Sequence, residues 1–301
     1  MGDAPEGYRS GFVSLVGRPN VGKSTLLNQI LKNKVAITSE RPQTTRTAIR
    51  GILTTPRAQL VFVDTPGLHK PRTALGERLN RVVHNTLGEV DAVVFLLDAV
   101  AGVGSGDEFL AGELRTLTIP VLVVLNKIDA AKPAELESSR VRALRMGAEW
   151  PTYGVSARTG QGVSDLVSEI VERLPTGPLY YPPDAVTDQA DQQMLAELIR
   201  EKVLRLTREE VPHSVAVVVD EIRTEGDDGI EVYATIYVER DSQKGIVIGK
   251  GGRMLKEIGT SARRDIETFL GGKHVYLHLR VKVEHDWQRR AAMVERFGYG
   301  T

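Results

Sequence analysis

The chain has 301 residues, contains no cysteine and has a formal net charge of zero, with 39 basic and 39 acidic side chains. This length suffices for about two domains of ordinary size. The lack of cysteine excludes disulfide bonds and thiolate metal sites, and the balanced charge favours no class of partner. Residues 1–10 lack the apolar stretch of a secretory signal, and the longest apolar runs are too short to span a bilayer. We therefore expect a cytoplasmic protein.

The first half of the chain, from residue 11 to about residue 174, alternates short β-branched runs with longer amphipathic stretches. The expected strands are residues 12–16, 59–63, 92–98, 121–126 and 152–155, with helices between them. Nearly unbroken apolar strands separated by helices indicate a mostly parallel sheet covered on both faces. We predict a doubly wound α/β domain over residues 1–178.

Four prolines and one glycine between Leu174 and Asp184 disfavour regular structure, and we place a linker at residues 179–188. Beyond it the pattern predicts a smaller α+β domain over residues 189–301. Its expected elements are a helix (189–207), two strands (214–223 and 230–239), a glycine-rich turn, a helix (253–270), a strand (274–283) and a short terminal helix.

A phosphate-binding loop pattern, Gly17-Arg-Pro-Asn-Val-Gly-Lys-Ser24, lies between the first expected strand and a helical segment. In this context backbone N–H groups and the positive end of the helix bind a phosphate. Lys23 is expected to reach the β- and γ-phosphates, and the Ser24 hydroxyl to ligate Mg²⁺. The predicted residues of this loop are Gly17, Asn20, Val21, Gly22, Lys23, Ser24 and Thr25.

The segment Asn126-Lys-Ile-Asp129 follows a buried strand and predicts the choice of base. The Asp129 carboxylate can accept hydrogen bonds from guanine N1–H and the N2 amino group together, whereas adenine offers no matching pair of donors. Asn126 is expected to support the loop and contact N7, and the Lys127 stem to cover the base. A backbone N–H of the Ser156-Ala157 pair is expected to point at guanine O6. The predicted guanine site comprises Asn126, Lys127, Asp129, Ser156, Ala157 and Arg158.

Two further polar segments predict the switch loops of a GTPase. In Asp64-Thr65-Pro66-Gly67, Asp64 is expected to hold Mg²⁺ through water, and the Gly67 amide to bond the γ-phosphate. Upstream, Thr45 or Thr44 is expected to complete the metal shell, with a solvated loop as the alternative for either residue. Leu68 stands where many GTPases carry a water-orienting glutamine. Hydrolysis is therefore expected to rely on positioning and charge stabilisation and to be slow.

A glycine-rich basic stretch in the second half predicts RNA binding. Residues 244–264 carry six basic side chains against one acid, whereas residues 186–301 carry 18 basic and 20 acidic groups. Glycines admit a sugar-phosphate backbone, and residues 246–248 are expected to form an apolar floor under the bases. Three tyrosines, Tyr233, Tyr237 and Tyr276, are expected to lie in the core. The predicted RNA-binding residues are Lys244, Gly249, Lys250, Gly251, Gly252, Arg253 and Lys256.

The five ordered motifs of the first half resemble the translation-factor-related family of small GTPases. Gly249-Lys-Gly-Gly252 resembles the G-x-x-G loop of a type II KH domain, and the two together are similar to the Era family over essentially the whole chain. The resemblance implies a ribosome-assembly factor that binds GTP and GDP, 16S rRNA near its 3′ end and the small (30S) ribosomal subunit. It implies RNA binding switched by the nucleotide, Mg²⁺ as cofactor, and in some members peripheral association with the inner membrane.

Asn20 matches the asparagine that helps to hold K⁺ in potassium-stimulated relatives, with a hydrogen bond inside the loop as the alternative. We expect a monomer. Three functional classes stay open: a GTP-driven timer that binds and leaves RNA, an RNA-binding module with negligible turnover, and a signalling GTPase at a membrane surface. The intact set Lys23, Ser24, Asp64, Gly67 and Asp129 disfavours the second. The loop at Gly249 and the absence of a lipidation signal in residues 298–301 disfavour the third.

Overall fold

A computed structural model describes residues 5–39, 41, 44–66, 73–147, 149–207, 211–225 and 229–299. Its contacts divide the chain into two compact units. The first unit comprises residues 1–36, 45–70 and 79–188, and the second comprises residues 37–44, 71–78 and 189–301. The short segment Ile37–Thr44 therefore belongs to the second unit, although in the chain it lies within the first half.

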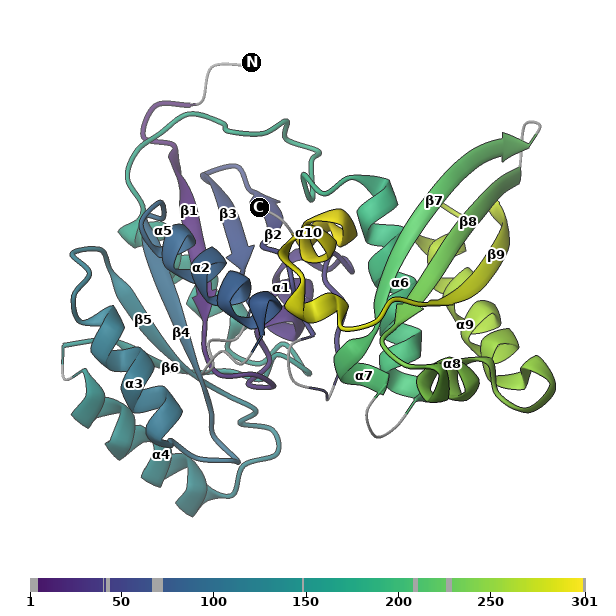
Figure 1. Cartoon of the computed structure of the whole chain (residues 1–301). Coiled ribbons are helices and arrows are strands. Elements are labelled where there is room, and N and C mark those ends of the chain that lie inside the picture. Colours follow the sequence, from purple (N-terminus) through teal and green to yellow (C-terminus); the bar gives the residue numbers. More distant parts are fainter. Residues whose placement is uncertain are drawn as a thin grey trace. The chain divides into compact units, whose positions relative to one another are not determined.

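The first unit is built on a six-stranded sheet with the strand order β2-β3-β1-β4-β5-β6 (Figure 1). Neighbouring strands are parallel except for the antiparallel pair β2–β3, so the predicted mostly parallel sheet is confirmed. Strand β2 was not predicted; it is a short edge strand with a glycine in its middle, and such strands give a weak sequence signal. The strands are β1 (Arg9–Val16), β2 (Ile49–Thr54), β3 (Ala58–Asp64), β4 (Ala92–Asp98), β5 (Val121–Asn126) and β6 (Thr152–Gly154).

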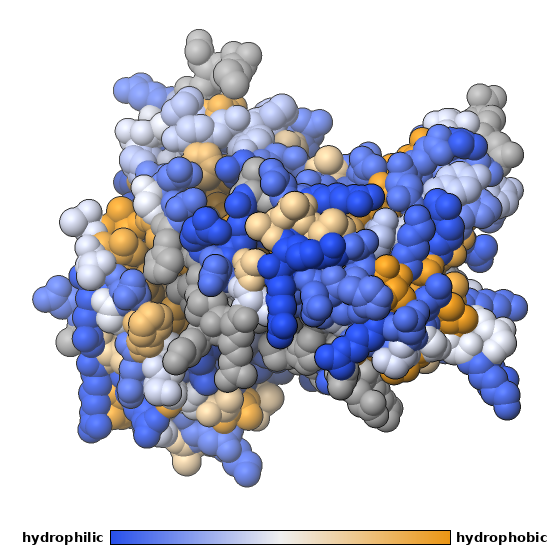
Figure 2. Space-filling view, viewed as in Figure 1, coloured by the Kyte–Doolittle hydropathy of each residue, from blue (hydrophilic) through white to orange (hydrophobic). Residues whose placement is uncertain are grey.

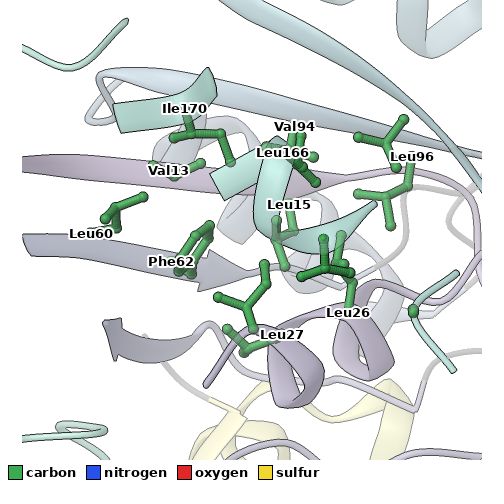
Figure 3. Packing of buried hydrophobic residues seen from close by; sticks show 14 of the residues in the cluster. Val13, Leu15, Leu26, Leu27, Leu60, Phe62, Val94, Leu96, Leu166 and Ile170 are labelled. Atoms are coloured by element: carbon green, nitrogen blue, oxygen red, sulfur yellow. The ribbon is translucent and has the colours of Figure 1, made fainter. Parts of the chain in front are cut away.

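Helices cover both faces of this sheet. Helices α1 (Lys23–Leu31) and α5 (Val163–Arg173) pack on one face, where Leu26 and Leu27 meet Leu15 and Phe62 (Figure 3). The opposite face is covered by α2 (Ala74–Leu87), α3 (Ser105–Leu114) and α4 (Pro133–Met146). Because successive strand residues enter one core or the other, every residue of β3, β4 and β5 is buried, which explains their nearly unbroken apolar sequences.

The expected linker at residues 179–188 instead packs against the first unit. The amides of Tyr180 and Tyr181 donate to the buried Gln59 side chain on β3, at 2.7 and 3.0 Å. The Ile52 amide on β2 donates to the carbonyl of Val186 at 2.8 Å. Proline prevents helix formation here, but an extended chain can still pair with a neighbouring strand. The stretch is therefore an ordered extension of the first unit that ends at Asp188.

The second unit has a three-stranded sheet of β7 (Ala216–Glu225), β8 (Gly229–Val238) and β9 (His274–Val283), in that order. Strands β7 and β8 are antiparallel, whereas β8 and β9 are parallel. Helices α6 (Asp191–Leu206), α8 (Asp241–Ile248) and α9 (Arg253–Phe269) bury their apolar sides on it, which confirms the α+β prediction. Helix α8 occupies part of the stretch predicted as a glycine-rich turn. The short helices α7 (Val211–Ser214) and α10 (Ala291–Val294) complete the unit.

Within the part of the chain that the structure describes, no helix is both long and apolar enough to cross a membrane. Hydrophilic residues predominate on the face shown in Figure 2, and hydrophobic residues are scattered among them.

Candidate nucleotide site and nucleic-acid interface

The phosphate-binding loop connects β1 to α1 at the carboxyl edge of the large sheet. Strand β1 lies between β3 and β4, and the helices that follow β1 and β3 cover opposite faces, which is the position where open α/β sheets bind ligands. No side chain caps α1, and its first turn has no acidic residue, so its amides can bind an anion. Gly22 is required because a Cβ there would lie 2.3 Å from Nδ2 of Asn126.

Lys23 lies buried beneath this loop. Its ammonium donates to the carbonyls of Gly17 at 3.0 Å and Arg18 at 3.2 Å. Burial lowers the pKa of Lys23, and the nearby Asp64 carboxylate opposes that effect. Phosphate oxygens would supply the negative charge that a buried ammonium needs. Val21 is part of the core and Thr25 is half-buried in α1, so these two shape the loop.

Three oxygen-bearing side chains converge beside Lys23. Ser24 Oγ lies 2.6 Å from Asp64 Oδ2 and 3.0 Å from Thr45 Oγ1, and Thr45 Oγ1 lies 3.1 Å from the same carboxylate oxygen. Asp64 is fully buried, and its other oxygen, Oδ1, has no hydrogen-bond partner among the described residues. Burial raises the pKa of Asp64, and Lys23 opposes this rise. Hydroxyl and carboxylate oxygens are the ligands that Mg²⁺ prefers, and Asp64 Oδ1 could accept a hydrogen bond from a water bound to the ion. The cluster therefore fits a hydrated Mg²⁺.

The structure distinguishes between the two threonines of the first switch. The Thr44 hydroxyl donates to the Arg41 carbonyl at 2.8 Å, away from the oxygen cluster that Thr45 joins. In the second switch, the Thr65 hydroxyl donates to the Leu15 carbonyl at 3.0 Å and so fixes the end of β3 to β1, while Pro66 is buried. Gly67 and Leu68 lie outside the described residues, and the role of the Gly67 amide stays a prediction.

Asn126 connects two loops of the base site. Its Nδ2 donates to the Val21 carbonyl at 2.8 Å, and its Oδ1 accepts from the Ala157 amide at 2.9 Å. The Ser156 amide donates to the Gln161 carbonyl at 2.9 Å. Both amides therefore have partners inside the protein, and the contact of this pair with guanine O6 stays a prediction. Arg158, the third predicted residue of this loop, is exposed.

Lys127 is held by an ion pair that the sequence analysis missed. Its ammonium lies 2.5 Å from Asp98 Oδ2 and 2.9 Å from the Asn20 carbonyl. Burial alone would raise the pKa of Asp98, but hydrogen bonds from Lys127 and the Ala101 amide keep it below its ordinary value. The sequence offered one signal for this ion pair. Asp98 is the last residue of β4, and it lies directly beside Asn126, the residue before Lys127. Asp129 is exposed, and its carboxylate has no hydrogen bond to the described residues, so it is free to bind a base.

The G-x-x-G loop follows α8 and opens helix α9. Gly251 and Gly252 have φ values of 61° and 77°, and a Cβ on either would meet nothing within 4 Å. Glycine is favoured by the backbone conformation, and the space above the loop is open. Lys250 and Arg253 are exposed beside it, and the first turn of α9 has no acidic residue. A sugar-phosphate backbone can therefore approach this loop closely.

A groove of about 500 Å³ runs from the loop along α9 and the edge strand β9. Lys256 lines it as predicted, and Thr260 and Arg263, which were not predicted as site residues, line it one and two turns further on. Their spacing of three to four residues places them on one face of the helix. The complete lining is Gly252, Leu255, Lys256, Gly259, Thr260, Arg263, Val275, Tyr276, Leu277, His278 and Leu279. Lys244, on α8, is half-buried and is not part of this lining.

Two expectations about apolar residues were wrong. Val247 is fully buried in the core and Ile246 is exposed, so residues 246–248 form no continuous floor. Leu255 and Leu277 line the groove instead.

The second of these expectations concerned the three tyrosines. Tyr237 is buried against Phe297 as expected, but Tyr276 is 47% exposed. Tyr233, also expected in the core, is half-buried and stacks on His278 with ring centroids 4.5 Å apart. Alternate residues of β8 and β9 point away from the helices, which cover one face of this sheet.

Comparison with known proteins agrees with this arrangement. Residues 12–127 match the family described as 50S ribosome-binding GTPase, and residues 210–288 match the KH domain family. A variant of Era from Aquifex aeolicus bound to GDP.AlF4- is 39% identical, with a TM-score of 0.94 over 97% of this chain and 100% of that chain. Era in complex with MgGDPNP and nucleotides 1506–1542 of 16S ribosomal RNA is also 39% identical, with a TM-score of 0.94 over 98% and 100% of the two chains.

The fold and the nucleotide site define a P-loop GTPase joined to a KH domain. The chain belongs to the Era family of GTPases, as the sequence resemblance indicated.

Proposed function

We propose that this protein is a Mg²⁺-dependent GTPase that binds 16S rRNA near its 3′ end and acts on the small ribosomal subunit, with RNA binding switched by GTP and GDP. The observation that carries the proposal is the convergence of Ser24, Thr45 and Asp64 beside the buried Lys23. Two Era structures support it, one bound to GDP.AlF4- and the other to MgGDPNP and 16S rRNA nucleotides. The open G-x-x-G loop and the basic groove beside it support the RNA-binding part.

The residues of the site divide the work of phosphoryl transfer. Ser24 and Thr45 would ligate Mg²⁺ directly and Asp64 through water, and the ion would neutralise charge on the β- and γ-phosphates. Lys23 and the amides of the loop bind and orient the same phosphates, while Asp129 selects guanine. Because Leu68 has no group that could orient water, catalysis depends on positioning and charge stabilisation, and the intrinsic rate is slow.

Phosphate release from GTP tests the enzymatic part of the proposal. Replacing Lys23 by alanine removes the buried cation, and we expect turnover to fall by about 100-fold or more. Ser168→Ala, on the exposed side of α5, is the control and should hydrolyse GTP like the wild type. Turnover by Lys23→Ala equal to that of the wild type would contradict the assigned site.

We also propose that K⁺ assists hydrolysis beside Asn20, which lies in the phosphate loop with a left-handed φ of 64°. A second cation would compensate for the missing glutamine at Leu68. Hydrolysis should then be faster in K⁺ than in Na⁺ at equal ionic strength, and Asn20→Ala should abolish the difference. Asn20→Gly is the companion variant, because glycine adopts this φ without strain and removes the same amide. Identical rates of the wild type in both salts would rule out K⁺ here.

We further propose that the protein is a cytoplasmic monomer that contacts the inner membrane peripherally. The family resemblance supports the membrane contact. Sedimentation equilibrium tests the monomer, and flotation with anionic liposomes tests the contact. A stable dimer would contradict the first, and absence from the floating fraction would contradict the second.

A further inference from the structure

Helix α6 contains a group of buried charges that the proposed sites do not use. Arg200 and Glu201 are fully buried, and Lys202 is 5% exposed. Burying ions costs free energy that only close pairing offsets. Each of these three side chains has an ion-pair partner on α6 itself: Arg200 pairs with Glu197, and Glu201 pairs with Lys202. The three also make bonds outside α6, to two other parts of the second unit: the segment Ile37–Thr44 and helix α9.

The first partner is the segment Ile37–Thr44. The Glu201 carboxylate accepts the Thr38 amide at 2.9 Å and the Arg205 guanidinium at 3.0 Å. Arg205 also donates to the Thr38 hydroxyl at 2.9 Å, and Arg200 donates to the Thr44 carbonyl. The Ile37 side chain belongs to the core of the same unit. Both ends of this segment are therefore fixed to α6.

The second partner is α9, the helix that lines the RNA groove. Lys202 lies 3.0 Å from Glu201 and also pairs with Asp265 of α9. Helix α9 begins directly after the G-x-x-G loop and carries Lys256 and Arg263. The Glu201 carboxylate is therefore shared between the segment Ile37–Thr44 and an ion pair to the helix of the RNA site.

The residue after this segment belongs to the nucleotide site. Thr45 is part of the first unit, and its hydroxyl lies against Ser24 and Asp64 where Mg²⁺ fits. One peptide bond joins it to Thr44, whose carbonyl Arg200 holds. If the position of Thr45 differed between GTP and GDP, the movement would therefore reach a segment that is bonded to α6.

We propose that Glu201, with Arg205 beside it, is the positioning residue through which the segment Ile37–Thr44 transmits the nucleotide state to the RNA groove. This inference rests on the proposed function and names how its switch works. A movement of Thr38 changes which donors share the Glu201 carboxylate. In a low-dielectric interior this changes the strength of the ion pair between Lys202 and Asp265. Each nucleotide thereby favours a different arrangement of one charge network, which is what coupling between two sites requires.

The experiment measures RNA affinity of the full chain with a non-hydrolysable GTP analogue and with GDP, using a synthetic RNA of nucleotides 1506–1542 of 16S rRNA as the probe. Binding at one of two coupled sites typically changes affinity at the other about 5- to 150-fold. We expect the ratio of the RNA affinity with the GTP analogue to that with GDP, in either direction, to lie in this range for the wild type. In Glu201→Gln and in the more exposed Arg205→Gln the ratio should approach 1, while GTP affinity stays unchanged. Asp191→Asn removes one charge from the exposed first turn of α6 and should keep the wild-type ratio.

Amide hydrogen exchange supplies a second readout that simple destabilisation would not reproduce. In the wild type, the Thr38 amide should exchange at different rates with the GTP analogue and with GDP. In Arg205→Gln its rate should be the same with both nucleotides. A cooperative unfolding transition of Arg205→Gln shows that this variant is folded. A wild-type ratio that persists in folded Glu201→Gln or Arg205→Gln overturns the inference alone. Equal RNA affinities of the wild type in both states overturn the proposed switch, and the inference with it.

Discussion

Replacing Asp129 by asparagine is expected to weaken GTP binding by about 10⁴-fold and to strengthen binding of xanthosine triphosphate. The Asp129 carboxylate is exposed and makes no hydrogen bond with the described residues, so both of its oxygens can accept from guanine N1–H and the N2 amino group. The side-chain NH₂ group of asparagine would face one of these two guanine N–H groups, so that two hydrogen-bond donors would meet. Xanthine has a carbonyl oxygen at position 2, which accepts that donor.

Titration of both nucleotides against the wild type and Asp129→Asn measures this exchange of specificity. Asp165→Asn is the matched control, because it makes the same chemical change on the exposed first turn of α5. The control should bind GTP like the wild type. GTP affinity unchanged by Asp129→Asn would remove this residue from the base site, whatever the xanthosine result.

The double substitution Lys250→Asp with Gly251→Asp is expected to lower RNA affinity by about 100-fold or more, because like charges brought together at an interface cost several kcal/mol. Both positions lie in the open G-x-x-G loop, where a phosphate can approach the backbone. GTP affinity should not change. Filter retention of 16S rRNA nucleotides 1506–1542 over a range of salt concentrations measures the loss, and the wild type should show the steeper salt dependence.

The pair Lys250→Asn with Gly251→Asn separates charge from shape. Asparagine has the size of aspartate and tolerates a positive φ similarly, and Gly251 has a φ of 61°. The asparagine pair should lose the Lys250 contact but keep much more RNA binding than the aspartate pair. Equal losses in the two pairs would show that space or backbone conformation, and not phosphate charge, governs binding at this loop.

The sequence by itself determined the features whose chemistry lies in a short stretch of chain. The phosphate loop, the guanine motif and the G-x-x-G loop each have fixed residues at fixed spacing beside a strand or helix, and the fold places each one there. The mostly parallel sheet was predictable for a related reason. A strand buried on both faces needs apolar residues at every position, which leaves a signal in the sequence. Strand β2 is at the sheet edge and left no such signal.

The tertiary structure decided everything that depends on residues far apart in the chain. It places Thr45 rather than Thr44 against Asp64, pairs Asp98 with Lys127, and uses both ends of the Asn126 side chain within the protein. It also assigns the segment Ile37–Thr44 to the second unit, where Glu201 of α6 accepts the Thr38 amide across 163 positions of sequence. Local propensity and spacing contain no information on such pairs, because the partners meet only when the sheets and helices have packed.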